Sequence, residues 1–123
     1  MPFTSEMDDV FHYGIQMPVR SHGFIVERVD QEAFTGEILS QIKRRIEAAA
    51  VVIADLTGAN PNVYLEVGYA WGCGRPCILL IHGHENPRFD LVGTKHLRYE
   101  RIRDLEKKLS TEVAQLREKG LIG

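Results

Sequence analysis

The sequence predicts an α/β domain with a mostly parallel sheet, and two observations support this prediction. First, two short segments, Val51–Ala54 and Cys77–Ile81, are apolar throughout, which is typical of strands buried on both faces. Second, helical segments lie between and around them, so that strands and helices alternate along the chain. The length of 123 residues fits one compact domain, and we expect residues 1–123 to form it.

The amino-terminal part is expected to hold two helices and a short strand before the first buried strand. The first helix covers about Met7–Val19 and is kinked or ended by Pro18. A short strand, Phe24–Val26, follows. A loop over Val29–Thr35 then leads to a second helix, whose apolar stripe consists of Ile38, Leu39, Ile42, Ile46 and Ala49.

The carboxyl-terminal part continues the alternation. A loop over Asp55–Asn60 leads to a helix that begins at Pro61, with Asn60 as its N-cap, and ends near Gly72 or Gly74. His96–Tyr99 is expected to be a last short strand. A C-terminal helix within residues 98–123 carries the apolar stripe Ile102, Leu105, Leu109, Val113 and Leu116.

Composition and charge exclude several classes of protein. The chain is 44% hydrophobic with a net charge of −2, which argues against disorder and against binding of nucleic acid or membrane surfaces by bulk electrostatics. The longest apolar run, Ala48–Ala54, is far too short to span a bilayer, and the amino terminus lacks the regions of a signal peptide. The gap between Cys73 and Cys77 is not a usual zinc spacing, so we expect two reduced thiols in a cytoplasmic protein.

Polar side chains gather where the first buried strand meets the following helix. Asp55 comes directly after that strand, where a carboxylate can reach a ligand. Asn60 and Asn62 flank the start of the helix, where free N–H groups and the helix dipole favour an anion. Pro61 removes one of these donors and weakens such a site. His82 and His84 follow the second buried strand, but without a third ligand they are expected to be polar loop residues.

Glu66 is the only charged residue between Asn62 and Trp71. At about 100° per residue it falls on an apolar arc of the helix, and such surroundings raise the pKa of a carboxyl group unless a partner compensates. Carboxyl groups with raised pKa values cluster at functional sites. The alternatives are a glutamate at a solvent-exposed edge, or one paired with Arg75 or Lys95.

The run from Ala54 to Ala70, ADLTGANPNVYLEVGYA, closely resembles the central motif of the nucleoside 2-deoxyribosyltransferase-like superfamily, which includes nucleotide-binding and TIR-like bacterial members. The resemblance covers roughly residues 1–100. Shorter pieces along the chain agree with it, namely Met1-Pro2-Phe3, Gly23-Phe24, Phe34–Ile38, Gly74-Arg75-Pro76 and Phe89–Leu91.

The resemblance implies a flavodoxin-like three-layer sandwich and chemistry at an N-glycosidic bond, with no cofactor and no metal. In active members, the glutamate that matches Glu66 attacks the anomeric carbon of a nucleoside or nucleotide, and water or a second base resolves the glycosyl-enzyme. Asp55 matches a position that contacts the substrate, and we expect its carboxylate to share one cavity with Glu66 as the second catalytic group. The expected substrate-binding residues are Phe3, Thr57, Asn60 and Asn62, with Phe3 stacking on the base or else packing in the core.

Two features depart from this family. The chain starts at the Met-Pro-Phe motif, so the first strand is expected to be truncated, and a second copy could cover the unpaired backbone; we therefore expect a homodimer or higher homo-oligomer. The position of Asn60 is often acidic in true transferases. An N-glycosidase or deoxyribosyltransferase is the leading interpretation. The alternatives are a nucleotide-binding sensing module without turnover, and a receiver-like domain with Asp55 as phosphoacceptor.

Overall fold

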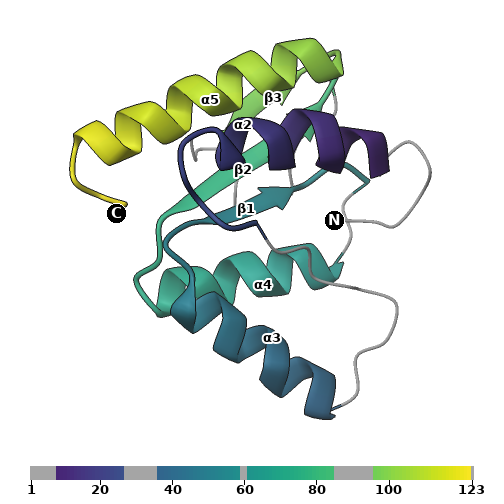
Figure 1. The fold of residues 1–123 in the computed structure, drawn as a ribbon. Helices are drawn as coiled ribbons and strands as arrows, with labels where there is room; N and C mark the ends of the chain where they lie inside the picture. Colours follow the sequence, from purple (N-terminus) through teal and green to yellow (C-terminus); the bar gives the residue numbers. More distant parts are fainter. Residues whose placement is uncertain (1–7, 27–35, 59–60, 85–95, 123) are drawn as a thin grey trace.

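The computed structural model describes residues 8–26, 36–58, 61–84 and 96–122, without the side chains of residues 36–39 and 62 (Figure 1). Its centre is a parallel sheet of β1 (Val52–Asp55), β2 (Cys77–His82) and β3 (Leu97–Tyr99), in the order β1-β2-β3. The predicted α/β class with a parallel sheet is therefore confirmed, and so is the last strand near residues 96–99.

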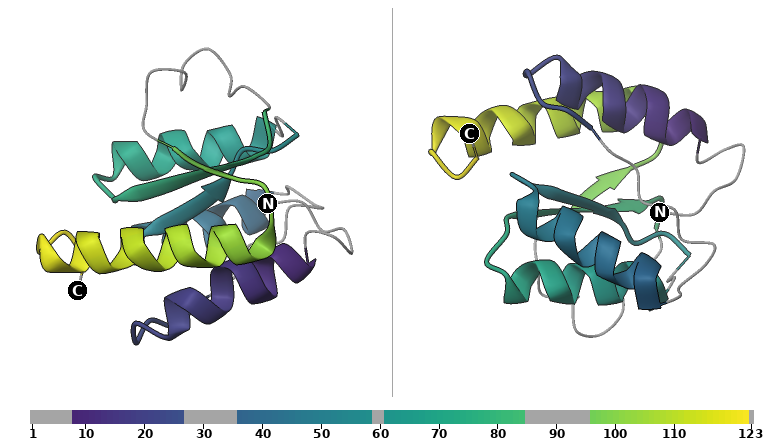
Figure 2. Two further views of the ribbon diagram at one scale, coloured as in Figure 1. Left: turned by 90° about the horizontal axis from the view of Figure 1, so that it is seen from above. Right: turned by 60° about the horizontal axis from the view of Figure 1, so that its bottom comes forward.

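Helices cover both faces of this sheet and make three layers (Figures 1 and 2). The helices α3 (Gly36–Ala48) and α4 (Pro61–Gly72) lie on one face. The segments η1 (Val10–Gln16) and α2 (Met17–Arg20) lie with α5 (Ile102–Glu118) on the other. The predicted start of a helix at Pro61 is thus correct.

Strand residues alternate between the two helical layers, as the pleat requires. Ile78, Leu80 and Tyr99 belong to a core cluster with the α5 residues Leu105 and Leu109. The intervening strand residues pack with α4 in a second cluster of Ala54, Leu56, Val63, Val67, Leu79 and Ile81. The apolar stripe predicted for the last helix is therefore used inside the chain, because Leu105, Leu109 and Val113 are fully buried.

The predicted strand Phe24–Val26 is wrong for the described structure, because these residues follow the turn after α2 and join no strand. They still alternate as extended backbone does: Phe24 and Val26 pack against the core, whereas Ile25 is exposed. The end of α5 holds this segment in place. Arg117 Nη1 donates to the His22 carbonyl at 2.6 Å, and its guanidinium lies over the Phe24 ring.

The first helical segment passes through Pro18 instead of stopping there. Proline has no N–H, and the helix is π-helical before it, with the Met17 N–H bonded to the His12 carbonyl five residues earlier. Pro18 then lies in the first turn of α2, where the missing donor costs little. Close by, a Cβ on Gly14 would meet Leu105 Cδ2 at 2.7 Å, so glycine lets η1 approach α5 closely.

The predicted truncation of the first strand falls on residues 1–7, which lie outside the described part of the chain. Within the described part, no helix is long and apolar enough to cross a membrane.

Candidate functional site

The three parallel strands end at one edge of the sheet, and each ends on a polar or aromatic side chain. These are Asp55 on β1, His82 on β2 and Tyr99 on β3. In open α/β sheets, ligands bind beyond the carboxyl ends of the strands. We call Asp55, Thr57, His82 and Tyr99 the strand-end cluster.

Asp55 is buried, with 1% of its surface exposed, and both of its carboxylate oxygens are bonded. Oδ2 accepts a hydrogen bond from the Tyr99 hydroxyl at 2.6 Å, and Oδ1 accepts one from the Thr57 N–H at 3.0 Å. Burial and the neighbouring Asp55 carboxylate both disfavour a phenolate, so the pKa of Tyr99 lies well above its usual value. Asp55 therefore joins two strands and a loop, and its burial argues against a phosphoacceptor role.

The loop after β1 is fastened to β2 as well. The Thr57 hydroxyl accepts a hydrogen bond from the His82 N–H at 2.9 Å. Gly58 follows in a left-handed conformation at φ +82, which favours glycine and turns the chain toward α4. His82 Nε2 pairs with the Glu100 carbonyl at 2.9 Å, and the ring lies 5.2 Å from that of Tyr99. These bonds hold the start of the loop between β1 and α4 in place.

Glu66 lies in the second turn of α4, about 7.5 Å along the axis from Pro61. It sits at the border of the buried face, which is formed by Val63, Val67 and Ala70. The side chain is half-buried, and this burial raises the pKa of its carboxyl group. Tyr69, three residues on, shares this side of the helix and donates a hydrogen bond to a glutamate of α3. Glu66 therefore lies on the side of α4 that faces α3.

The two predicted catalytic carboxylates start from opposite sides of the sheet. Ala54 packs in the cluster with α4, and alternation then directs the next residue, Asp55, toward the α5 side, where it meets Tyr99. Glu66 belongs to the α4 layer. The pleat of β1 decides the face on which Asp55 lies, so the expectation that both carboxylates line one cavity stays a prediction.

The other predicted site residues are only partly visible. Thr57 is half-buried in the strand-end cluster. Phe3 and Asn60 lie outside the described residues, and for Asn62 only the backbone in the first turn of α4 is described. Tyr99 is a member of the cluster that the sequence argument missed. The available signal was its place at the end of a predicted strand, on the same edge of the sheet as Asp55.

Cys73 and Cys77 flank the turn between α4 and β2, and His82 ends β2 instead of lying in the loop that follows it. Cys73 and Cys77 are free, and burial raises the pKa of the Cys77 thiol to about 11. His84 is exposed beside Glu100. Among the residues that the structure describes, no group of three or more histidine, cysteine, aspartate or glutamate side chains could hold a metal ion.

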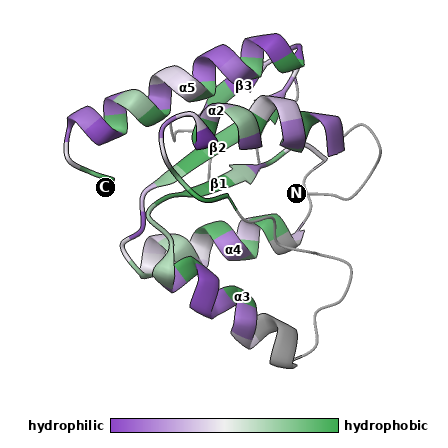
Figure 3. Ribbon diagram, in the orientation of Figure 1, coloured by the Kyte–Doolittle hydropathy of each residue, from purple (hydrophilic) through white to green (hydrophobic). Residues whose placement is uncertain are grey.

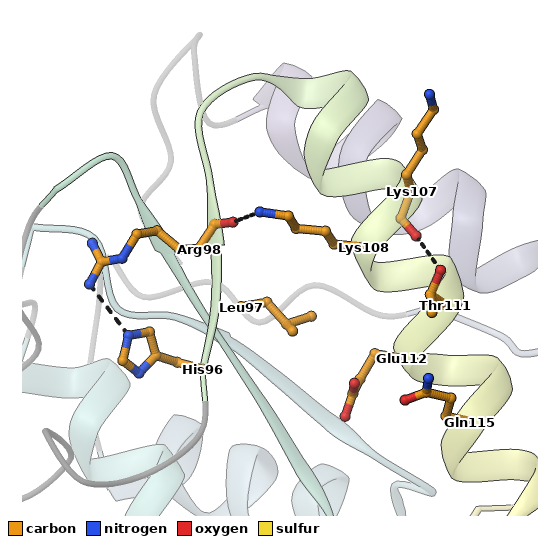
Figure 4. A pocket seen from close by; sticks show the side chains of 8 residues that line it. All are labelled: His96, Leu97, Arg98, Lys107, Lys108, Thr111, Glu112 and Gln115. Carbon is orange, nitrogen blue, oxygen red and sulfur yellow. Dashed lines mark hydrogen bonds between the residues drawn. The ribbon is translucent and has the colours of Figure 1, made fainter.

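An open groove of about 470 Å³ lies away from these residues, between β3 and α5 (Figure 4). Its lining consists of His96, Leu97, Arg98, Lys107, Lys108, Thr111, Glu112 and Gln115. Lys108 Nζ donates to the Arg98 carbonyl at 2.5 Å and so covers the edge strand, a common protection against unwanted pairing. None of the predicted site residues lines the groove.

Comparison with solved structures finds a similar fold. The chain is similar in structure to the CMP N-glycosidase BcmB of Clostridium botulinum, with a TM-score of 0.67 and 19% sequence identity. The match covers 87% of this chain and 92% of that chain. No protein-family model matches the sequence, and no curated protein matches it. The two proteins therefore share their fold over nearly their full lengths.

Proposed function

We propose that this protein is an enzyme that cleaves the base–sugar bond of a nucleoside or nucleotide, with Glu66 as the nucleophile. The observation that carries the proposal is the position of Glu66, a half-buried carboxylate with a raised pKa and the single charged side chain of α4. Burial of a charged carboxylate costs free energy of folding, and perturbed carboxylates of this kind cluster at active sites.

Two further observations support the same chemistry. The fold is similar to that of a CMP N-glycosidase, and the ADLTGANPNVYLEVGYA segment resembles the motif of the deoxyribosyltransferase-like superfamily. In the proposed reaction, a Glu66 carboxylate oxygen bonds to the anomeric carbon as the bond to the base breaks. The base leaves with the electron pair and takes up a proton, and water then releases the sugar from Glu66.

Asp55 has a different role in this proposal. Its oxygens already bind Tyr99 and Thr57, so it holds the loop that leads to α4 in place. Thr57, Asn60 and Asn62 are the proposed contacts to the sugar or its 5′-phosphate, and Phe3 is the proposed contact to the base. Asp55 is then a positioning residue, which acts on the substrate through this loop.

Release of free base tests the proposal directly. Purified protein is incubated with ribo- and deoxyribonucleoside monophosphates, including CMP, and free base is measured by chromatography. Glu66→Gln keeps the shape of the side chain and removes the charge, and should lower the rate more than about 1,000-fold while nucleotide binding persists. Glu106→Gln, on the exposed side of α5, is the matched control and should leave the rate unchanged.

Two results would contradict the assignment. If Glu66→Gln releases base as fast as the wild type, Glu66 is not the nucleophile. If the wild type binds nucleotides in a parallel titration but releases no base, the protein is a nucleotide-binding module without turnover.

A further inference from the structure

Tyr69 links α4 to α3 through polar and apolar contacts. Its hydroxyl donates a hydrogen bond to the Glu47 carboxylate, and the Lys43 ammonium lies 5.5 Å from the centre of its ring. The side chain also packs against the core cluster that contains Ile42 and Ile46 of α3. The hydrogen bond to Glu47 raises the pKa of Tyr69 above its ordinary value of 10, so the phenol stays protonated at neutral pH and remains a donor.

The helix α3 depends on this link because it has few other neighbours. Among the described helices and strands its main neighbour is α4, and Figure 1 shows the two helices together on one face of the sheet. Figure 3 shows that the described part of α3 is mostly hydrophilic, and Ile42 and Ile46 are its buried residues among the described side chains. Without the Tyr69 hydroxyl, this small apolar contact and the Lys43 ammonium would hold α3 on α4.

Glu66 points toward the same side of α4. At about 100° per residue, its direction around the helix axis lies between those of Tyr69 and Ala70, about 60° from the first and about 40° from the second. Both of these residues contact α3. Glu66 lies about one turn nearer to the start of α4. The helix α3 is therefore the neighbouring element on the side to which Glu66 points.

We propose that Tyr69 and Glu47 are positioning residues for Glu66: their hydrogen bond holds α3 against α4, and α3 keeps water away from one side of the Glu66 carboxylate. The inference rests on the proposed function, in which Glu66 is the nucleophile. Positive charge develops on the sugar as the bond to the base breaks. A carboxylate stabilises that charge more strongly where water is excluded, because the local dielectric constant is lower. Neither Tyr69 nor Glu47 contacts the substrate in this role.

The pKa of Glu66 reports on the position of α3. The described ionisable side chains on this side of the two helices are Lys43 and Glu47 on α3, and Tyr69 and Cys73 on α4. Burial is the largest cause of the raised pKa of Glu66, and none of these four groups contributes to it. A change in this pKa when the link is removed therefore reports a change in the solvent exposure of Glu66.

Steady-state kinetics of base release from the nucleoside monophosphates tests the proposal. Tyr69→Phe keeps the ring and removes the hydroxyl, and should lower kcat about 10-fold with KM changed less than about two-fold, because the substrate contacts remain. Glu47→Ala should do the same, and Tyr69→Phe/Glu47→Ala should be no slower than either, because all three lack the same bond. Glu47→Gln keeps an acceptor and should retain at least about half of the wild-type kcat. Tyr13→Phe, on the exposed side of η1, is the matched control and should change neither constant.

A second measurement does not need turnover. The ¹³C resonance of the Glu66 carboxyl group, assigned with Glu66→Gln, is titrated in each variant by nuclear magnetic resonance. The pKa of Glu66 should lie closer to its ordinary 4.5 in Tyr69→Phe and Glu47→Ala than in the wild type, and should be restored in Glu47→Gln. If the wild type releases no base, the proposed function fails, and this titration still tests the positioning of Glu66.

Three results would overturn the inference. The first is a Tyr69→Phe variant with a lower Tm but with the kcat and the Glu66 pKa of the wild type, as expected of a link that only stabilises the fold. The second is a Glu47→Gln variant as slow as Glu47→Ala. The third, for a wild type that releases no base, is a pKa of Glu66 that is the same with and without the Tyr69 hydroxyl.

Discussion

Tyr99→Phe removes one oxygen atom from the centre of the strand-end cluster and leaves the shape of the side chain intact. Tyr99 is 2% exposed, and its hydroxyl donates the 2.6 Å hydrogen bond to Asp55. In the variant, Asp55 Oδ2 keeps its buried position without this donor. The substitution therefore measures how strongly β3 is coupled to the loop after β1.

The expected loss of stability follows from the type of bond. A hydrogen bond to a charged group contributes about 1.5–3 kcal/mol, and an unsatisfied buried acceptor costs a similar amount. We expect Tyr99→Phe to lower the free energy of unfolding by about 2 kcal/mol. For a chain of 123 residues this corresponds to a Tm lower by roughly 6–12 °C.

Urea unfolding followed by circular dichroism measures this difference. Tyr13→Phe is the control, since Tyr13 is 49% exposed, and the free energy should change by less than about 0.5 kcal/mol. The double variant Asp55→Asn/Tyr99→Phe should lose less stability than the sum of the two single variants, because both remove the same bond. A loss for Tyr99→Phe no larger than for Tyr13→Phe would refute the argument.

The same bond predicts a pH dependence. The pKa of Tyr99 is raised in the folded state, whereas an unfolded tyrosine ionises near pH 10. Above that pH the unfolded chain loses the phenolic proton and the folded chain retains it, so the contribution of Tyr99 is complete below about pH 10 and is lost as the pH rises further. The stability of Tyr99→Phe should therefore fall less steeply above pH 10 than that of the wild type.

Two further predictions concern other groups with raised pKa values. The pKa of Glu66 is raised above its ordinary 4.5, so the folded state favours the protonated form, and stability is lost as the pH rises through the folded value. Glu66→Gln should therefore raise the Tm at pH 7 but not below pH 4. The control Glu106→Gln should not change the Tm at either pH. The pKa of Cys77 is about 11, so in a Cys73→Ser background iodoacetamide should alkylate it about 100-fold more slowly at pH 8 than in urea, and equal rates would contradict its burial.

Much of the fold could be predicted because it depends on local patterns. Fully apolar segments predicted β1 and β2, and the Asn-Pro signal predicted the start of α4 correctly. Phe24–Val26 failed because an extended, alternating segment has the same local pattern whether it pairs with a strand or not. In the folded chain this segment contacts Arg117, which lies over the Phe24 ring and is 93 residues further along the chain.

The candidate site could also be predicted only in part from the sequence. Asp55 and Glu66 could be singled out because a carboxylate at a strand end and another in an apolar helix are visible in the sequence. Which face each occupies could not be predicted, because Asp55 follows the pleat of β1 and its partner Tyr99 is 44 residues away. The structure thus places a fully bonded Asp55 on the α5 side of the sheet and a half-buried Glu66 in the α4 layer, a separation that depends on the pleat of β1 and on a partner far along the chain.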